Sequence, residues 1–218
     1  MICWSCEREG GAGPLCAACG AVLPAAERED RFAVLGVPRK FSIDLDAAES
    51  NFKKLSRQVH PDRFATADPR ARKAALSRTV QLNEAWRTLK DPMRRAEYLL
   101  ELAGFGLKGD DHKRGEPVSE TAATRQVTAP PMLLMEILEL REELADAQRS
   151  GNSAKVHAMA AAMRVRHADT MAAIAQALDE PASAKLEEAA QLMVGLRYFQ
   201  RFLDEIPAEG SGHEVTHG

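Results

Sequence analysis

The sequence DLDAAESNFKKLSRQVHPD, residues 44–62, decides the fold. Its apolar residues recur at helical spacing and therefore share one side of an α-helix: Ala48, Phe52, Leu55 and Val59. Its cations project from the opposite side: Lys53, Lys54 and Arg57. Pro61 has no amide hydrogen and biases His60 away from helical dihedrals, so the helix is predicted to end near Val59. His60 and Asp62 then stand in a turn where the basic face ends.

The rest of the chain also predicts helices. Ala, Leu, Glu and Arg are abundant and aromatic residues make up only 5% of the chain, a composition that favours helix over strand. Helical patterns in the first half cover residues 31–37, 44–59, 69–90 and 93–103. Those in the second half cover residues 132–149, 153–178 and 181–206. We expect an all-α protein in which the short breaks between the last helices produce an antiparallel three-helix bundle.

Changes in composition divide the chain into parts. All the cysteines fall in residues 1–24, among Gly and Pro residues that exclude a long helix there. Residues 28–104 hold the first helices and residues 131–206 the predicted bundle. Between them, residues 105–130 are polar and read as a linker, and residues 207–218 are predicted to form a disordered tail.

Charge and hydropathy exclude several classes of partner. The net charge of −3 gives no overall attraction to nucleic acid or to anionic membranes. We find no apolar stretch long enough to span a bilayer and no export signal at the N-terminus. We therefore expect neither a nucleic-acid nor a membrane partner, and a location in the cytoplasm, or in the mitochondrial matrix if the chain is eukaryotic.

The cysteines form two C-x-x-C pairs: Cys3 with Cys6, and Cys16 with Cys19. Four thiolates in this pattern supply the tetrahedral ligand set of one structural Zn²⁺ ion, and the glycines between the pairs let the chain double back. Disulfides, bound iron or a thiol redox centre are the alternatives, and the missing export signal disfavours disulfides. A closed site of four cysteines has no open position, so catalysis by the metal is not implied. We expect no organic cofactor.

The turn at residues 60–62 has a plain structural interpretation beside a functional one. Asp62 can cap local amides while His60 remains an ordinary surface histidine. Catalysis here is not expected, because His60 has only Asp62 near it in sequence. The other internal histidines have no metal-ligand partners at suitable spacing and are expected at the surface: His112, His157 and His167.

Residues 133–146 form a helix with two separate apolar faces. One face is a seam for the bundle core: Leu133, Ile137, Leu140 and Leu144. A second face combines apolar and acidic residues: Leu134, Met135, Leu138, Glu139, Glu142 and Asp146. An exposed apolar patch rimmed by acids indicates a protein partner. Packing of Leu134 and Leu138 beneath the first domain or the linker is the alternative.

Residues 28–103 resemble the J-domain family. The similarity rests on FAVLGVP at 32–38, FKKL at 52–55, HPDR at 60–63, LNEAW at 82–86 and RAEY at 95–98. It implies a helical hairpin whose basic helix docks on an acidic surface of a heat-shock-protein-70-class ATPase chaperone. The His-Pro-Asp loop then promotes ATP hydrolysis by that partner. The residues concerned are Lys53, Lys54, Arg57, His60, Pro61, Asp62 and Arg63.

The second half narrows the resemblance to the HscB-type J-proteins of iron–sulfur cluster assembly. LLMEILELREEL at 133–144 is similar to the signature of their second domain, and residues 98–100, YLL, extend the likeness across 28–206. The resemblance implies delivery of an IscU-type cluster scaffold to an HscA- or DnaK-type chaperone. The implied scaffold-binding residues are Leu134, Met135, Leu138, Glu139, Glu142, Asp146 and Tyr198. Some members carry an N-terminal tetracysteine segment that Cys3 to Cys19 resemble.

We therefore interpret the chain as a non-catalytic adaptor with a chaperone-binding end and a scaffold-binding end. A general J-domain co-chaperone for other clients is one alternative. A zinc-ribbon nucleic-acid-binding protein is another, disfavoured because no basic cluster surrounds the cysteines. A thiol oxidoreductase lacks the βαβ context in which a C-x-x-C pair normally does redox work.

Overall fold

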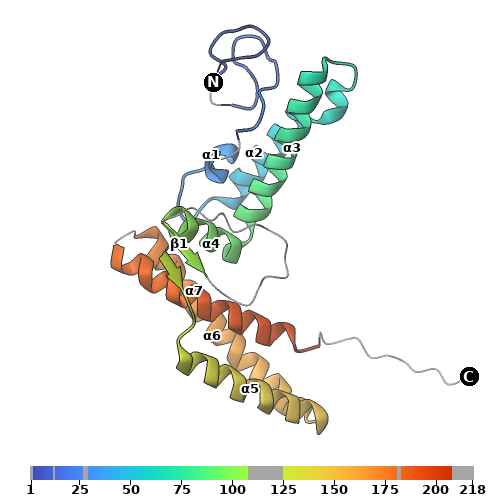
Figure 1. The fold of residues 1–218 in the computed structure, drawn as a ribbon. Coiled ribbons are helices and arrows are strands. Elements are labelled where there is room, and N and C mark those ends of the chain that lie inside the picture. Colours follow the sequence, from blue (N-terminus) through green and yellow to red (C-terminus); the bar gives the residue numbers. More distant parts are fainter. Residues whose placement is uncertain (1, 12, 27–28, 108–124, 181–182, 208–218) are drawn as a thin grey trace, which may run out of the picture. The chain divides into compact units, whose positions relative to one another are not determined.

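The structure is a computed structural model that describes residues 2–11, 13–26, 29–107, 125–180 and 183–207 of the 218-residue chain. The chain divides into two compact units, residues 1–99 and residues 100–218, and each is described here by itself. Both are largely helical, as Figure 1 shows. The predicted all-α class is confirmed, with one short pair of strands in addition.

The first unit is built on a helical hairpin of α2 (Leu45–Val59) and α3 (Pro69–Lys90), joined through the short 3-10 helix η1 (Pro61–Phe64). The side chain of Asp44 accepts a hydrogen bond from the Ala47 N–H at 2.9 Å and caps α2. Asp68 caps α3 in the same way, and Pro69 fills the first helical position, where a missing N–H costs nothing. The end of α2 at Val59 confirms the break expected before Pro61.

One ring pair lies within the hairpin, and a second joins the two remaining helices to each other, α1 (Arg31–Leu35) and α4 (Pro92–Leu102). Phe52 of α2 stacks on Trp86 of α3 with ring centroids 5.5 Å apart. Phe32 of α1 stacks on Tyr98 of α4 at 5.9 Å. Burial raises the pKa of Tyr98, and its hydroxyl donates to the Asp30 carboxylate that also caps α1. The Phe52–Trp86 contact holds one side of α2 against α3, and the cations of α2 face solvent.

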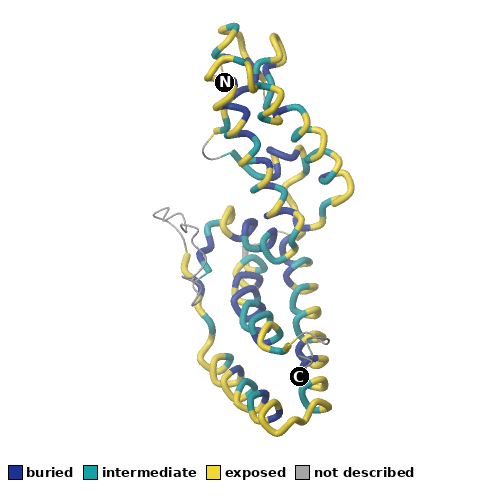
Figure 2. The backbone as a smooth tube through the Cα atoms, turned by 90° about the vertical axis from the view of Figure 1, so that its right-hand side faces the viewer, coloured by how far each residue is buried: buried dark blue, intermediate teal, exposed yellow. Residues whose placement is uncertain are grey.

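The second unit contains α5 (Pro131–Arg149), α6 (Ser153–Asp179) and α7 (Ser183–Asp204). Helices α6 and α7 form an antiparallel hairpin with the most extensive packing, and α5 packs against both. Burial is concentrated on α7, whereas α5 is exposed along most of its length (Figure 2). The fully buried large side chains of these three helices are Leu144, Ile174, Met193, Leu196 and Phe202. The predicted three-helix bundle is therefore present.

The strand pair consists of β1 (Phe105–Leu107) and β2 (Arg125–Val127), which pair in parallel. Both strands fall inside residues 105–130, which the sequence indicated to be a linker. They form because Phe105 and Val127 are buried and both strands lie against α7. The Arg197 guanidinium of α7 donates to the Leu107 carbonyl at 3.1 Å. The structure says nothing of residues 108–124, nor of residues 208–218, where the disordered tail was predicted.

No helix in the described part of the chain is both long enough and apolar enough to cross a membrane.

Candidate functional site

The tetracysteine segment folds into two similar knuckles. In the first, the Cys3 N–H donates to the Arg8 carbonyl at 2.8 Å, and the Glu7 N–H donates to the Cys3 carbonyl at 3.0 Å. In the second, the Cys16 N–H donates to Ala21 and the Gly20 N–H to Cys16, both at 2.8 Å. An isolated antiparallel bridge closes each knuckle, Ile2 with Glu9 and Leu15 with Val22. Each knuckle turns its two thiols to the same side.

The four sulfur atoms form a metal-sized cluster. All lie within 4.8 Å of one another, with Cys3 Sγ 3.7 Å from Cys19 Sγ and Cys6 Sγ 3.8 Å from Cys16 Sγ. Four sulfurs placed tetrahedrally at about 2.3 Å from a Zn²⁺ ion stand about 3.8 Å apart, so the donor set fits that ion. A disulfide requires about 2.05 Å, and all four cysteines are free. The predicted metal-binding cluster is therefore present.

The thiols differ in acidity because each has its own backbone donor and because neighbouring thiols act on one another. The backbone N–H of Arg8 is the largest influence that lowers the pKa of Cys6, to about 6. The backbone N–H of Ala21 lowers the pKa of Cys19, but burial and the neighbouring thiols outweigh it and raise that pKa to about 11. Four thiolates this close repel one another, so a bound cation is needed for all of them to ionise together.

The basic face of α2 is exposed as the sequence predicts. Lys53, Lys54 and Arg57 all face solvent, with Lys53 Nζ 2.8 Å from the Glu49 carboxylate one turn earlier. Arg63 lies just beyond the helix and donates from Nη1 to the Arg57 carbonyl at 3.1 Å. Because that carbonyl lies in the last turn of α2, Arg63 also adds positive charge where the helix dipole is negative.

The turn after α2 presents two polar side chains to solvent. His60 Nδ1 accepts a hydrogen bond from the Asp62 N–H at 3.3 Å, which leaves Nε2 on the outer side of the ring. The side chains of His60 and Asp62 are 55% and 90% exposed. Pro61 begins η1 between them. The purely structural interpretation of the turn predicted a local cap, and the cap is present, although His60 makes it rather than Asp62. The side chains of both residues nevertheless remain exposed and within reach of a partner.

The second predicted site lies on α5. Ile137 and Leu144 of the core seam are buried, whereas Leu134, Met135 and Leu138 are 42%, 60% and 59% exposed. Glu139, Glu142 and Asp146 are exposed beside them, and Asp146 pairs with Arg149. Tyr198 is half-buried on α7, which packs against α5. No described part of the second unit therefore covers the exposed side chains of Leu134, Met135 and Leu138.

Sequence reasoning missed one candidate on this face. Met132 is 78% exposed in the first turn of α5. It stands three residues before Met135, a spacing that places both on the same side of a helix. That spacing was the available signal, because residue 132 opens the helix predicted at 132–149, but the two-face pattern was taken from residues 133–146 alone.

Comparisons with known proteins follow the same division of the chain. A DnaJ domain model matches residues 30–98, and a model described as the HSCB C-terminal oligomerisation domain matches residues 129–207. The solved structure of the chaperone HscB from Vibrio cholerae is 30% identical, with a TM-score of 0.65, and the match covers 81% of this chain and 94% of that one. This chain belongs to the HscB family.

Two further proteins are similar to this chain, one in fold and one in sequence. The crystal structure of human co-chaperone protein HscB shares the fold, with a TM-score of 0.76 at 23% identity over 94% of this chain and 95% of that one. A curated relative, the co-chaperone protein HscB homolog of Vibrio cholerae, is 43% identical over 113 residues, which is 52% of this chain. The match spans 58% of that relative's length. The HscB resemblance read from the sequence is confirmed.

Proposed function

We propose that this protein is an HscB-type co-chaperone of iron–sulfur cluster assembly. Its J-domain docks on a heat-shock-protein-70-class ATPase chaperone of the HscA or DnaK type and stimulates ATP hydrolysis. Its C-terminal bundle binds an IscU-type scaffold and delivers it to that chaperone. The protein itself is an adaptor and catalyses nothing. The observation that carries the proposal is a basic helix ending in an exposed His-Pro-Asp turn, on one unit, with an uncovered apolar and acidic helix face on the other.

The charges of the first unit support docking on an acidic surface. Lys53, Lys54, Arg57 and Arg63 lie along and just beyond one exposed helix face. Rim charges of this kind raise the association rate more than the affinity, and salt screens them over about 10 Å at 0.1 M. Chaperone association is therefore expected to slow as the salt concentration rises.

His60 offers the sharpest test of the proposed activity. His60→Gln keeps a side-chain acceptor for the Asp62 N–H, so the turn and the circular dichroism spectrum are expected to survive. It removes the imidazole from the exposed loop, and stimulation of the chaperone ATPase is expected to vanish in single-turnover assays. His157→Gln, at an exposed position on α6, makes the same chemical change in the other unit and should leave stimulation intact. Full stimulation by His60→Gln would contradict the assignment.

The metal of the tetracysteine cluster is proposed to be zinc in a structural role. The sulfur distances suit it, and the four-thiolate set leaves no position for a substrate. Elemental analysis of protein purified without added metal is expected to return about one zinc ion per chain. Stoichiometric iron, or two freely titrating thiols, would favour the redox alternative.

Two alternative functions, a nucleic-acid-binding protein and a general co-chaperone, have less support. A nucleic-acid-binding ribbon requires cations near the cysteines, but Glu7 and Glu9 flank the first knuckle and are exposed. A general co-chaperone for other clients shares the J-domain, and only scaffold binding by α5 distinguishes it. The proposal places the protein where both partners occur, in the cytoplasm or, for a eukaryotic chain, in the mitochondrial matrix.

A further inference from the structure

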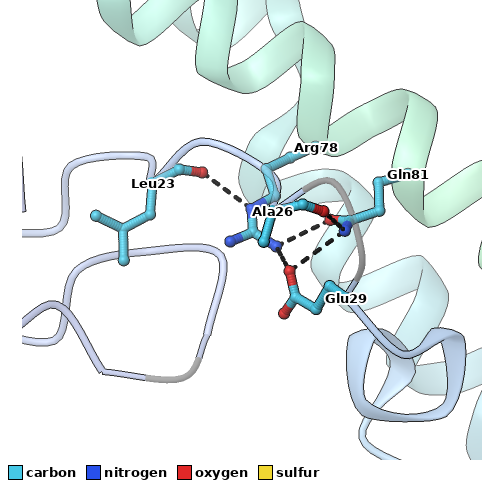
Figure 3. Close-up of polar contacts among 5 residues, drawn as sticks. All are labelled: Leu23, Ala26, Glu29, Arg78 and Gln81. Atoms are coloured by element: carbon cyan, nitrogen blue, oxygen red, sulfur yellow. Dashed lines mark hydrogen bonds and ion pairs between the residues drawn. The ribbon is translucent and has the colours of Figure 1, made fainter. Parts of the chain in front are cut away.

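A buried arginine, Arg78, attaches the tetracysteine segment to the J-domain. We call Arg78 and its hydrogen-bond partners Leu23, Glu29 and Gln81 the Arg78 latch. Arg78 of α3 is 5% exposed, and its Nε donates to the Leu23 carbonyl at 2.9 Å. Its Nη1 donates to Glu29 Oε2 at 2.6 Å and to the Gln81 side-chain oxygen at 2.9 Å (Figure 3). Gln81 in turn donates to the Ala26 carbonyl and to Glu29. A buried guanidinium is costly without these partners, so the latch fixes the segment on the hairpin.

A cleft of about 340 Å³ is lined by the latched segment and by residues of α1, α2 and α3. The loop between the knuckles contributes Gly13 and Pro14 to the lining, and α2 contributes Asn51, Lys54, Leu55 and Gln58. Arg78 and Glu29 also reach the cleft but neutralise each other. Lys54 is therefore the lining charge that the latch does not balance. A cleft at the lower end of the ligand-sized range holds a few side chains rather than a folded element.

Lys54 belongs both to this cleft and to the basic face of α2. Arg57 follows Lys53 by four residues and Lys54 by three, so it neighbours both lysines on the helix surface. A partner that covers these cations also meets the loop at residues 13–14. The cleft adjoins the basic face of α2, so a partner that binds this face also reaches the cleft. The positive charge of Lys54 beside the apolar Leu55 suits a segment that is acidic and partly apolar.

We propose that the tetracysteine segment enlarges the chaperone-docking surface, and that the cleft between residues 13–14 and α2 receives an acidic, partly apolar segment of the heat-shock-protein-70-class ATPase chaperone. This inference rests on the proposed function. It gives the metal cluster a purpose within that function, because the knuckles shape the loop that forms one wall of the cleft.

Gly13 allows a clean test. A Cβ built on Gly13 comes within 4 Å of the Leu15 carbonyl oxygen alone, at 3.9 Å, so the first side-chain carbon is accommodated there. Gly13→Glu places an acid opposite Lys54, which repels an acidic partner and competes for the lysine. Ala18→Glu makes the same charge change at an exposed position of the second knuckle that does not line the cleft. Metal content and circular dichroism of both variants are compared with the parent first.

The expected result is a difference between matched variants in equilibrium binding to the purified chaperone. Gly13→Glu should weaken the Kd about fivefold or more, and Ala18→Glu by less than about twofold. Gly13→Lys should tighten binding about twofold, which keeps the test usable if the glutamate variant fails to hold its metal. The gap between Gly13→Glu and Gly13→Lys should narrow as salt is raised, because the effect is electrostatic.

Lys54→Ala separates failure of this inference from failure of the proposed function. Undiminished chaperone binding by Lys54→Ala would contradict docking through α2 and remove both proposals. Weakened binding by Lys54→Ala, with Gly13→Glu and Ala18→Glu indistinguishable, would overturn the cleft proposal alone. Equal Kd values for Gly13→Lys and the parent would overturn it as well.

Discussion

The residues that follow the second cysteine of each knuckle adopt a left-handed backbone. Glu7 has a φ of 58° and Gly20 a φ of 74°, and the two occupy equivalent positions. An L side chain in this region costs about 1 kcal/mol because its Cβ crowds the backbone. The first knuckle tolerates that strain at Glu7, whereas the second avoids it with glycine.

Gly20→Ala should therefore destabilise the second knuckle without preventing it from folding. No atom lies within 4 Å of a Cβ built at Gly20, so only backbone strain is added, and the metal-loaded segment should lose about 1 kcal/mol. Gly13→Ala is the matched control, because its backbone is unstrained and it should change stability by no more than about 0.5 kcal/mol. Chelator competition measured against both variants checks the prediction, and equal metal retention would contradict it.

His167 is a residue whose environment the sequence did not reveal. It was predicted at the surface, but it is only half-exposed on α6, and its Nε2 is buried without a hydrogen-bond partner in the described structure. Burial lowers the pKa of His167, because the charged form loses hydration there. The position lies four residues after the buried Met163, on the core side of the helix.

The sign of the pH dependence follows from that shift. With the folded pKa lowered, the unfolded chain binds the proton more readily, so the second unit should lose stability as the pH falls below about 6.5 towards the folded pKa. His167→Leu should reduce this loss. Urea unfolding of the parent and the variant at pH 7.5 and 5.5 measures it. An identical pH dependence in the two proteins would show that His167 does not contribute.

At the scale of elements, α5 is attached to its neighbours by comparatively few apolar contacts. Its buried residues are Ile137, Leu144 and Ala147. Ion pairs supplement them: Glu136 with Arg166 of α6 at 2.9 Å, Glu143 with Lys155 of α6 at 2.8 Å, and Arg141 with Glu205 just beyond α7 at 2.6 Å. Arg166 lowers the pKa of Glu136 by hydrogen bonding to its carboxylate. This mode of attachment leaves the opposite face of α5 for a partner.

The exposed apolar face of α5 leads to a prediction about scaffold binding. Leu134→Ala combined with Leu138→Ala should weaken scaffold binding at least tenfold, because each truncation removes about 1 kcal/mol or more of interface contact. Folding should be unaffected, since both side chains are exposed. Val165→Ala, at a 61% exposed position on α6, is the matched control. Titration calorimetry with the scaffold gives the result, while ATPase stimulation without scaffold should remain unchanged. Unaltered scaffold affinity would refute the assignment of this face.

At the scale of the whole molecule, metal loading is coupled to one unit and not to the other. The cysteine cluster and the Arg78 latch both lie within residues 1–99. The cluster has little apolar core of its own, since only Cys3, Cys16 and Leu23 form its buried centre. Its stability therefore depends on the metal, as is usual for small metal-binding segments.

Removal of the metal should change amide hydrogen exchange in some parts of the chain and not in others. After treatment with a strong chelator, amide hydrogen exchange should accelerate in the knuckles and in the α3 turns around Arg78, because loss of the Leu23 carbonyl leaves the guanidinium poorly paired. Exchange in α6 and α7 should stay as it was. Uniform acceleration in both units, or none near Arg78, would contradict this coupling.

Much of this architecture could be read from local patterns. The helix at Leu45–Val59, its break before Pro61, the core seam of α5 and the cysteine cluster all depend on residues a few positions apart. Such features are decided by helical periodicity, by the missing amide of proline and by ligand spacing. The sequence by itself therefore determined the helical fold, the two-part organisation and the grouping of the four cysteines.

Only the tertiary structure decided how distant segments meet. The parallel pairing of Phe105–Leu107 with Arg125–Val127, the burial of His167 and the contact of Arg78 with Leu23, 55 residues away, leave no periodic trace in the sequence. Each depends on burial of polar or apolar groups that become neighbours only after the helices pack. The cleft beside Lys54 belongs to the same class, because its walls come from segments that the sequence places about 40 residues apart.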